Sequence, residues 1–124
     1  MGCVVALKVI EKTQRDNLAG KAKAIGDIIK SRLWEMYGKY DVIGDIRGLG
    51  AMFGVEFVKN RNSKEPYPEI VKKITRYALK KEVIFISAGI FDNVIRFLPP
   101  LVMTEEQVNF GMDVLDEAIE NCRW

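Results

Sequence analysis

The sequence contains no histidine, two cysteines and only four prolines. The absence of histidine removes the commonest general base and metal ligand, and it excludes every Ser–His or Cys–His nucleophile pair. Cys3 and Cys122 lie near opposite ends of the chain without the spacing of a metal site. We therefore expect no metal site and two free, buried thiols in a reducing cytoplasm, although the spacing leaves a disulfide between them open.

An excess of one charge is also lacking, because 19 basic residues face 17 acidic ones and leave a net charge of +2. No basic stripe interleaved with aromatic residues is present, so we expect no nucleic-acid partner. No apolar run reaches the ~20 residues of a membrane span. The MGC start has Ala6 where a myristoylation signal needs Ser or Thr, and it has no signal-peptide cleavage pattern. These absences favour a cytoplasmic protein without a membrane partner.

The first half of the chain combines helical with alternating patterns. Apolar residues at spacings of three and four predict two helices over the first 40 residues, with a break near residues 15–17 and an N-cap at Asp16 or Asn17. In the first helix we expect Val4, Val5, Leu7 and Ile10 to form one apolar stripe. Alternation over residues 42–47 and 51–58 predicts two strands joined by a tight glycine turn.

The second half predicts a polar loop at residues 59–68, a helix over 69–81, a buried strand over 83–87 and a strand over 94–98 that Pro99 and Pro100 end. Thr104 and Gln107 have the spacing of a capping box. The helix after them presents one apolar face, made of Val108, Met112, Leu115 and Ile119. The order ααββαββα predicts a single α+β domain spanning residues 1–124, with a small antiparallel or mixed sheet covered by helices on one side.

Arg96 lies within a strand whose other residues are Val94, Ile95, Phe97 and Leu98. Periodicity favours an outward-facing strand arginine that solvent hydrates. The alternative is a guanidinium held by its strand, which offers a planar pair of donors to a substrate carboxylate. The glycine-rich segment at residues 44–57 is not a phosphate loop, since its glycines precede a strand and no GxxxxGK[ST] is present. Arg47 beside it can pair with Asp45, Glu56 or a partner surface.

Three segments together carry a family resemblance: RGLGAMFGVEF at residues 47–57, EIVKKITRYALKKEVIFISAG at 69–89 and NVIRFLPPLVMTEEQ at 93–107. In this order they resemble the class III pyridoxal-phosphate-dependent aminotransferases, and RGLGAM is most similar to the 4-aminobutyrate aminotransferases. The resemblance implies that the chain is the small C-terminal domain. It also implies a partner large domain, a homodimeric enzyme and pyridoxal 5'-phosphate as cofactor of the complete protein.

The resemblance also implies roles for individual residues. Arg96 matches the strand arginine that binds the carboxylate of glutamate or 2-oxoglutarate, while Gly89 and Asn93 match positions of the loop before it. None of the 12 lysines lies in the context of the cofactor lysine. We therefore expect no catalytic and no cofactor-binding residue here, no cofactor bound to this chain alone, and no activity of the chain by itself.

Several alternatives remain open from the sequence. Ala88 stands where 4-aminobutyrate enzymes often have cysteine, and acetylornithine and ornithine aminotransferases share the strand around Arg96. A free-standing regulatory module that binds carboxylates is an alternative from another class. An assembly module that associates through apolar helix faces is a third.

Overall fold

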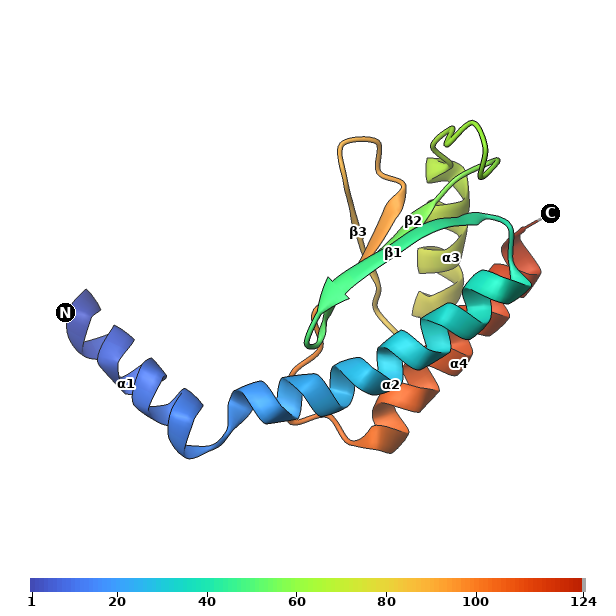
Figure 1. Ribbon diagram of the computed structural model, residues 1–124. Helices are drawn as coiled ribbons and strands as arrows, with labels where there is room; N and C mark the ends of the chain where they lie inside the picture. Colours follow the sequence, from blue (N-terminus) through green and yellow to red (C-terminus); the bar gives the residue numbers. More distant parts are fainter. Residues whose placement is uncertain (124) are drawn as a thin grey trace.

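The computed structural model describes residues 1–123. Two helices open the chain, α1 (Gly2–Arg15) and α2 (Leu18–Lys39), and they meet at a corner (Figure 1). At this corner Asn17 is the N-cap of α2 and has a left-handed φ of 47°. The break therefore lies where the sequence predicted it, and Asn17 rather than Asp16 is the cap.

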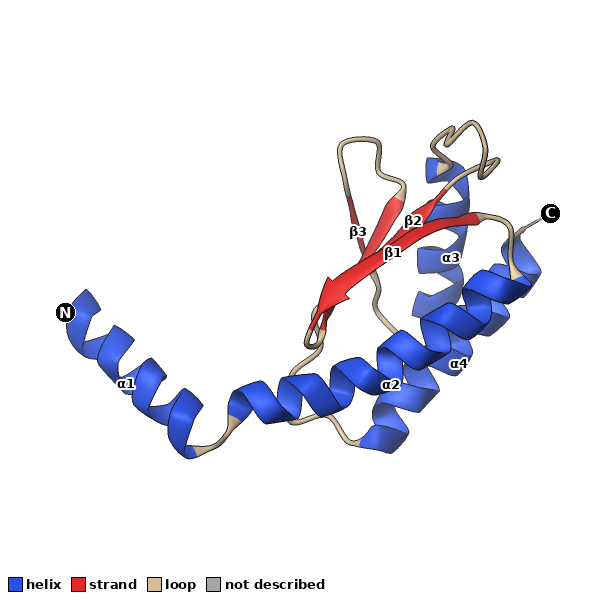
Figure 2. Ribbon diagram, in the orientation of Figure 1, coloured by secondary structure: helices blue, strands red, loops and turns tan. Residues whose placement is uncertain are grey.

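A four-stranded antiparallel sheet forms one layer of the structure (Figure 2). Its order is β1-β2-β4-β3, and the strands are β1 (Ile43–Leu49), β2 (Met52–Phe57), β3 (Ile86–Ala88) and β4 (Val94–Phe97). The predicted hairpin is present, and Gly50 at its turn has a φ of +57°, which glycine adopts without steric cost. The sheet is antiparallel throughout, which confirms the α+β class.

The buried strand predicted over residues 83–87 is wrong in extent and in burial. Only Ile86–Ala88 form β3, which is an edge strand paired with β4 alone. Ile84 and Ile86 are 78% and 51% exposed. A run of β-branched and aromatic residues indicates a strand buried on both faces, whereas this sheet has helices on only one of its faces.

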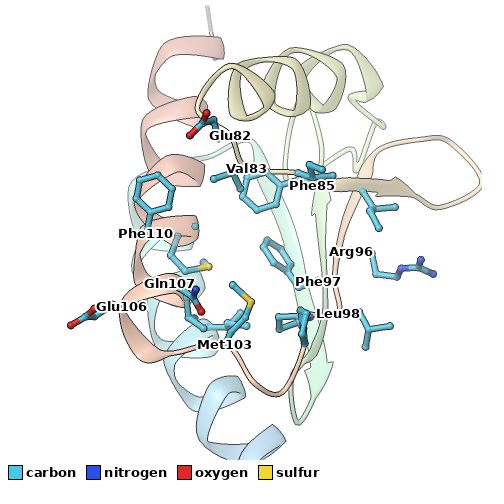
Figure 3. Close-up of a pocket in the computed structure, with 18 residues that line it drawn as sticks. Glu82, Val83, Phe85, Arg96, Phe97, Leu98, Met103, Glu106, Gln107 and Phe110 are labelled. Atoms are coloured by element: carbon cyan, nitrogen blue, oxygen red, sulfur yellow. The ribbon is translucent and has the colours of Figure 1, made fainter.

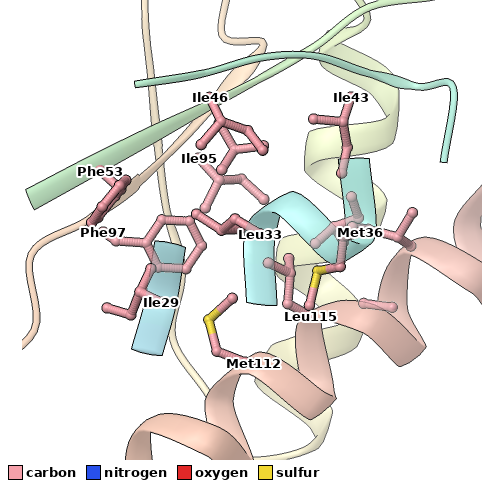
Figure 4. Close-up of a cluster of buried hydrophobic side chains, with 14 of the residues drawn as sticks. Ile29, Leu33, Met36, Ile43, Ile46, Phe53, Ile95, Phe97, Met112 and Leu115 are labelled. Carbon is pink, nitrogen blue, oxygen red and sulfur yellow. The ribbon is translucent and has the colours of Figure 1, made fainter. Parts of the chain in front are cut away.

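Helices α2, α3 (Pro68–Lys80) and α4 (Glu105–Cys122) cover one face of the sheet. Alternate strand residues point at them, among them Val55, Phe57 and Ile95, each of which is 0% exposed. Figure 4 shows Ile95 of β4 facing Leu33 of α2 and Leu115 of α4. All four residues predicted for the apolar face of the last helix are buried: Val108, Met112, Leu115 and Ile119.

Local signals at the helix ends are confirmed for α4. Thr104 Oγ1 accepts from the Gln107 amide at 3.2 Å, and Gln107 Oε1 accepts from the Thr104 amide at 2.9 Å, which completes the capping box.

The end of α2 depends on a contact that local sequence did not indicate. Arg61 donates to the carbonyls of Tyr37, Tyr40 (2.9 Å) and Ile43 (3.0 Å), so it supplies donors that the last turn lacks.

Helix α1 extends away from the rest of the domain, and none of its residues is buried. The predicted apolar stripe is therefore exposed, with Leu7 at 61% and Ile10 at 53%.

Both cysteines are free, as expected, but Cys3 is exposed, which corrects the prediction of a buried thiol. Cys122 is buried, and burial raises the pKa of its thiol.

One interhelical contact makes stability depend on pH. The Tyr77 hydroxyl and the Lys81 ammonium donate to Glu117 Oε1 at 2.6 and 3.1 Å, and these bonds hold the pKa of Glu117 below its ordinary value of 4.5. A carboxyl whose pKa is lowered by folding stabilises the protein above its ordinary pKa, and this contribution is lost as the pH falls through the folded value. We expect Glu117→Gln to lower the urea midpoint at pH 7 and to have a smaller effect at pH 3, where more of the carboxyl is protonated. Equal effects at both pH values would contradict this linkage.

Candidate functional site

The face of the sheet turned away from the helices carries the candidate site. Strand register places Arg47, Gly54, Arg96 and Ile86 side by side across all four strands, in that order. The next row along the strands is Asp45, Glu56, Val94 and Ala88. We call these two rows the open face. They bring together residues that lie up to 51 positions apart in the sequence.

Arg96 is exposed on the open face, while its strand neighbours Ile95 and Phe97 are buried on the other side. Figure 3 shows its guanidinium pointing away from Phe85 and Phe97. Within residues 1–123 the guanidinium has no hydrogen bond or ion pair. The strand thus fixes the start of the side chain and leaves all its donors available to an external anion. The outward orientation favoured by periodicity is confirmed, and a carboxylate site requires the same orientation.

Arg47, in the same row, is already paired. It donates to Asp45 and to Glu56, the latter at 3.3 Å. Partial burial lowers the pKa of Arg47, but the bonds to Asp45 and Glu56 outweigh it and raise the pKa above its ordinary value. The sequence left three partners open for Arg47, and the structure shows the two intrachain ones. Arg96 is consequently the guanidinium of this row that remains free to bind a ligand.

Gly54 lies between the two arginines. A Cβ at this position would meet only Val94 Cγ1, at an ordinary contact distance of 3.5 Å. The fold therefore does not require glycine here, and its missing side chain leaves space beside Arg96. Sequence analysis did not single out Gly54, because only the pairing of β2 with β4 places it next to Arg96.

The predicted loop residues lie between β3 and β4. Gly89 has a φ of +87°, which favours glycine, and it begins the turn. Asn93 is 3% exposed, and its Nδ2 donates to the Phe57 carbonyl at 3.0 Å. The Phe57 amide donates in turn to the Asn93 carbonyl at 2.7 Å. Both residues hold the loop that leads to Arg96, and their contact with a substrate stays a prediction.

A cavity of about 810 Å³ lies on the helix side of the sheet, between the start of α4 and the end of β4 (Figure 3). We call it the α4 groove. Its walls are largely apolar and include Phe85, Phe97, Met103 and Phe110. Arg96 lines one edge, but its guanidinium points away from the other lining side chains in Figure 3. The α4 groove and the open face therefore adjoin at β3 and β4, where Ile86 and Arg96 border both surfaces.

Neither candidate surface carries a metal cluster or a Schiff-base lysine within residues 1–123. Among residues 1–123 no three His, Cys, Asp or Glu side chains come together to hold a metal ion. The open face and the α4 groove contain no lysine, the residue that forms a Schiff base with pyridoxal phosphate. None of the described helices is long and apolar enough to cross a membrane. The arrangement suits the binding of an anion at Arg96.

Comparison with known proteins matches residues 1–119 to the class III aminotransferase family model. A 4-aminobutyrate aminotransferase of Mycobacterium leprae is 38% identical over 96% of this chain and 26% of its own length. A leucine/methionine racemase of Thermococcus litoralis is 39% identical over 92% of this chain and 25% of its own length.

Solved structures agree with these matches. An aminotransferase of Bacillus anthracis superposes with a TM-score of 0.85 and 29% identity, over 96% of this chain and 28% of that protein. The chain thus spans less than a third of the proteins it matches, and it corresponds to a C-terminal part of them.

Proposed function

We propose, because this chain belongs to the class III aminotransferase family, that it is the substrate-binding C-terminal domain of a pyridoxal-phosphate-dependent transaminase, in which Arg96 binds the substrate carboxylate. The observation that carries the proposal is the unpaired guanidinium of Arg96 on an anchored strand. Two parallel N–H···O bonds to a carboxylate would fix both the position and the orientation of a substrate.

The neighbours of Arg96 suit this role. Gly54 leaves space on one side, and Ile86 provides an apolar wall on the other, at 51% exposure. The loop ordered by Gly89 and Asn93 borders the strand, and we assign these two residues to substrate binding with Arg96. The Arg47 pair with Asp45 and Glu56 adds no free positive charge, so one carboxylate is bound at one place.

The cofactor does not fit the residues of this chain, because neither candidate surface offers a lysine. Pyridoxal 5'-phosphate and its lysine would belong to a large domain, which corresponds to the part of the relatives that this chain does not span. We propose that this large domain is the chain's partner in a cytoplasmic homodimeric enzyme.

The proposed reaction is transfer of the amino group of 4-aminobutyrate to 2-oxoglutarate. The M. leprae relative supports this substrate, and acetylornithine or ornithine is the alternative amino donor. The names of the M. leprae and T. litoralis relatives both include amino acids. All of these candidate substrates carry a carboxylate, so the proposed carboxylate recognition applies to each of them.

The proposal is tested by NMR of the arginine Nε–Hε groups during titration with glutarate and with 4-aminobutyrate. We expect shifts centred on Arg96 that do not saturate below about 10 mM, since one exposed charged pair contributes at most ~1 kcal/mol. Arg76, an exposed arginine of α3 without a hydrogen-bond or ion-pair partner in residues 1–123, is the matched control. Arg96→Ala should abolish the clustered shifts in residues 86–97. Equal shifts at Arg76 and Arg96, or none at Arg96, would refute the assignment.

The same titration distinguishes the proposed transaminase domain from a second candidate function. A free-standing regulatory module must bind its metabolite without help from another domain, and a useful sensor needs a dissociation constant in the micromolar range (about −8 kcal/mol). Saturation of the Arg96 signal at micromolar ligand would favour that function over a half-site of a transaminase.

A further inference from the structure

A third row of side chains continues the open face next to Arg96. Leu49 and Met52 are paired across β1 and β2, and each lies two positions along its strand from the row of Arg96. Leu98 follows β4, two positions after Arg96, and Phe97 between them is buried on the other side. Because side chains alternate along a strand, all three lie on the face of Arg96. We call Leu49, Met52 and Leu98 the apolar row.

All members of the apolar row are exposed, at 89% for Leu49, 54% for Met52 and 64% for Leu98. Ile86, at 51%, adds a further apolar side chain directly beside Arg96. Large apolar side chains that gather on a surface commonly mark a place where a ligand or another protein binds. The free guanidinium of Arg96 is therefore bordered by exposed hydrocarbon along its own strand and on the neighbouring strand.

The opposite end of the open face has a different character. Its row contains Asp45 and Glu56, whose carboxylates accept hydrogen bonds from Arg47. A hydrocarbon chain lying over these carboxylates would remove them from water without replacing the lost hydrogen bonds, which is unfavourable. Over the apolar row the same chain would displace water from apolar surface, which is favourable. A ligand held at Arg96 is thus expected to extend toward the apolar row.

Charge and strand geometry define the ligand at this place. The guanidinium of Arg96 has no hydrogen bond or ion pair within residues 1–123, and its planar donors match a carboxylate. Residues on one face of a strand lie about 7 Å apart, which is the spacing between Arg96 and Leu98. With bonds of roughly 1.5 Å, an aliphatic chain of about six carbons spans that distance.

We propose that the apolar row binds the hydrocarbon chain of the carboxylate held by Arg96, so that the open face selects straight-chain aliphatic carboxylates over short ones. Met52 and Leu98 are then residues that determine specificity. This inference rests on the proposed carboxylate site and adds to it the class of ligand. The proposed amino donor, 4-aminobutyrate, carries a methylene chain beside its carboxylate and belongs to this class.

Straight-chain carboxylates from acetate to hexanoate test the proposal when they are titrated at constant ionic strength and the Nε–Hε signal of Arg96 is followed by NMR. A fully buried methylene group raises affinity about fourfold, and one covered on a single side about twofold. We therefore expect hexanoate to bind about 15-fold more tightly than acetate. The ε-methyl signal of Met52 should shift with hexanoate and stay in place with acetate.

Two leucines provide matched variants. Leu98 and Leu79 are 64% and 62% exposed, and Leu79 lies on α3, outside the open face. Leu98→Ser should reduce the ratio between hexanoate and acetate to about 4-fold or less, whereas Leu79→Ser should leave the ratio unchanged. Both variants should keep the wild-type melting temperature, because neither side chain is buried. Hexanamide, which has the same chain without the charge, should not shift Met52 at concentrations where hexanoate does.

The outcomes separate this inference from the carboxylate site itself. Equal affinities of acetate and hexanoate at Arg96 would overturn the role of the apolar row and leave the carboxylate site intact. No shift at Arg96 with any member of the series would overturn both. Shifts at Met103 in place of Met52 would put the chain in the α4 groove, and equal binding of hexanamide would mean that hydrocarbon binds without Arg96. Either of these results would also overturn the proposal.

Discussion

Gly26→Ala is expected to destabilise the domain by about 3 kcal/mol or more. Gly26 is buried on α2 at the point where this helix touches the β1–β2 turn. A Cβ at residue 26 would lie 1.8 Å from the Gly50 carbonyl oxygen, and this neighbour is backbone rather than a mobile side chain. To accept alanine, α2 must move away from the hairpin, and the contacts of Ile25 and Ile29 with the core would be lost.

The same helix provides the control. Gly38 is exposed, and a Cβ there would have no neighbour within 4 Å. Gly38→Ala should raise the free energy of unfolding by up to about 1 kcal/mol, because alanine favours a helix more than glycine does. Urea denaturation of both variants measures the difference. If Gly26→Ala proved neutral, α2 would not pack on the turn as closely as described.

The second large expected effect is a complete absence of transaminase chemistry in the isolated chain. When the chain is mixed with pyridoxal phosphate and treated with borohydride, we expect no stoichiometric label at any single lysine. The reason is that a specific Schiff base needs a lysine held beside groups that bind the phosphate and the ring. Neither the open face nor the α4 groove supplies that lysine.

Peptide mapping after reduction separates specific from nonspecific labelling. Exposed lysines such as Lys72 and Lys80 should carry scattered, low labels that 4-aminobutyrate does not displace. A single lysine labelled to completion, together with formation of glutamate from 2-oxoglutarate, would refute the prediction. The same assay with Arg96→Ala should give the same scattered labels, since Arg96 has no role in nonspecific reaction.

Local patterns were sufficient for much of the fold. The break before α2, the β1–β2 hairpin and the capping box at Thr104 each depend on residues within a few positions of one another. The apolar face of α4 was likewise predictable from its helical spacing. The antiparallel sheet with helices on one side followed from the order of these elements.

Features that depend on distant neighbours were not predictable in this way. The sequence of residues 83–87 indicates a buried strand, but burial there depends on whether a second layer covers that face of the sheet. The apolar residues of α1 similarly predict a packed helix, whereas none of the helix's residues is buried by the part of the chain that the structure describes. The contact between Gly26 and Gly50 joins two segments 24 positions apart, and no local pattern marks it.

The candidate site was likewise predictable only in part. Arg96 was identified from its apolar strand and the family resemblance, and its outward orientation followed from periodicity. Its isolation from other charges could not be predicted, because this depends on Arg47 taking both Asp45 and Glu56 as partners. The space at Gly54 became visible only once the register of β2 and β4 was known.

Arg61 limits how this domain can vary in length. Residues 59–67 between β2 and α3 are polar and lack regular structure apart from one bridge at Pro66, as is typical of segments that accept insertions. Here, however, one side chain of this segment binds three carbonyls at and just after the end of α2, and its guanidinium lies 4.0 Å from the centre of the Tyr37 ring. An insertion between Val58 and Arg61 would withdraw the guanidinium and leave those carbonyls without a donor. Length changes should therefore be selected against between Val58 and Arg61.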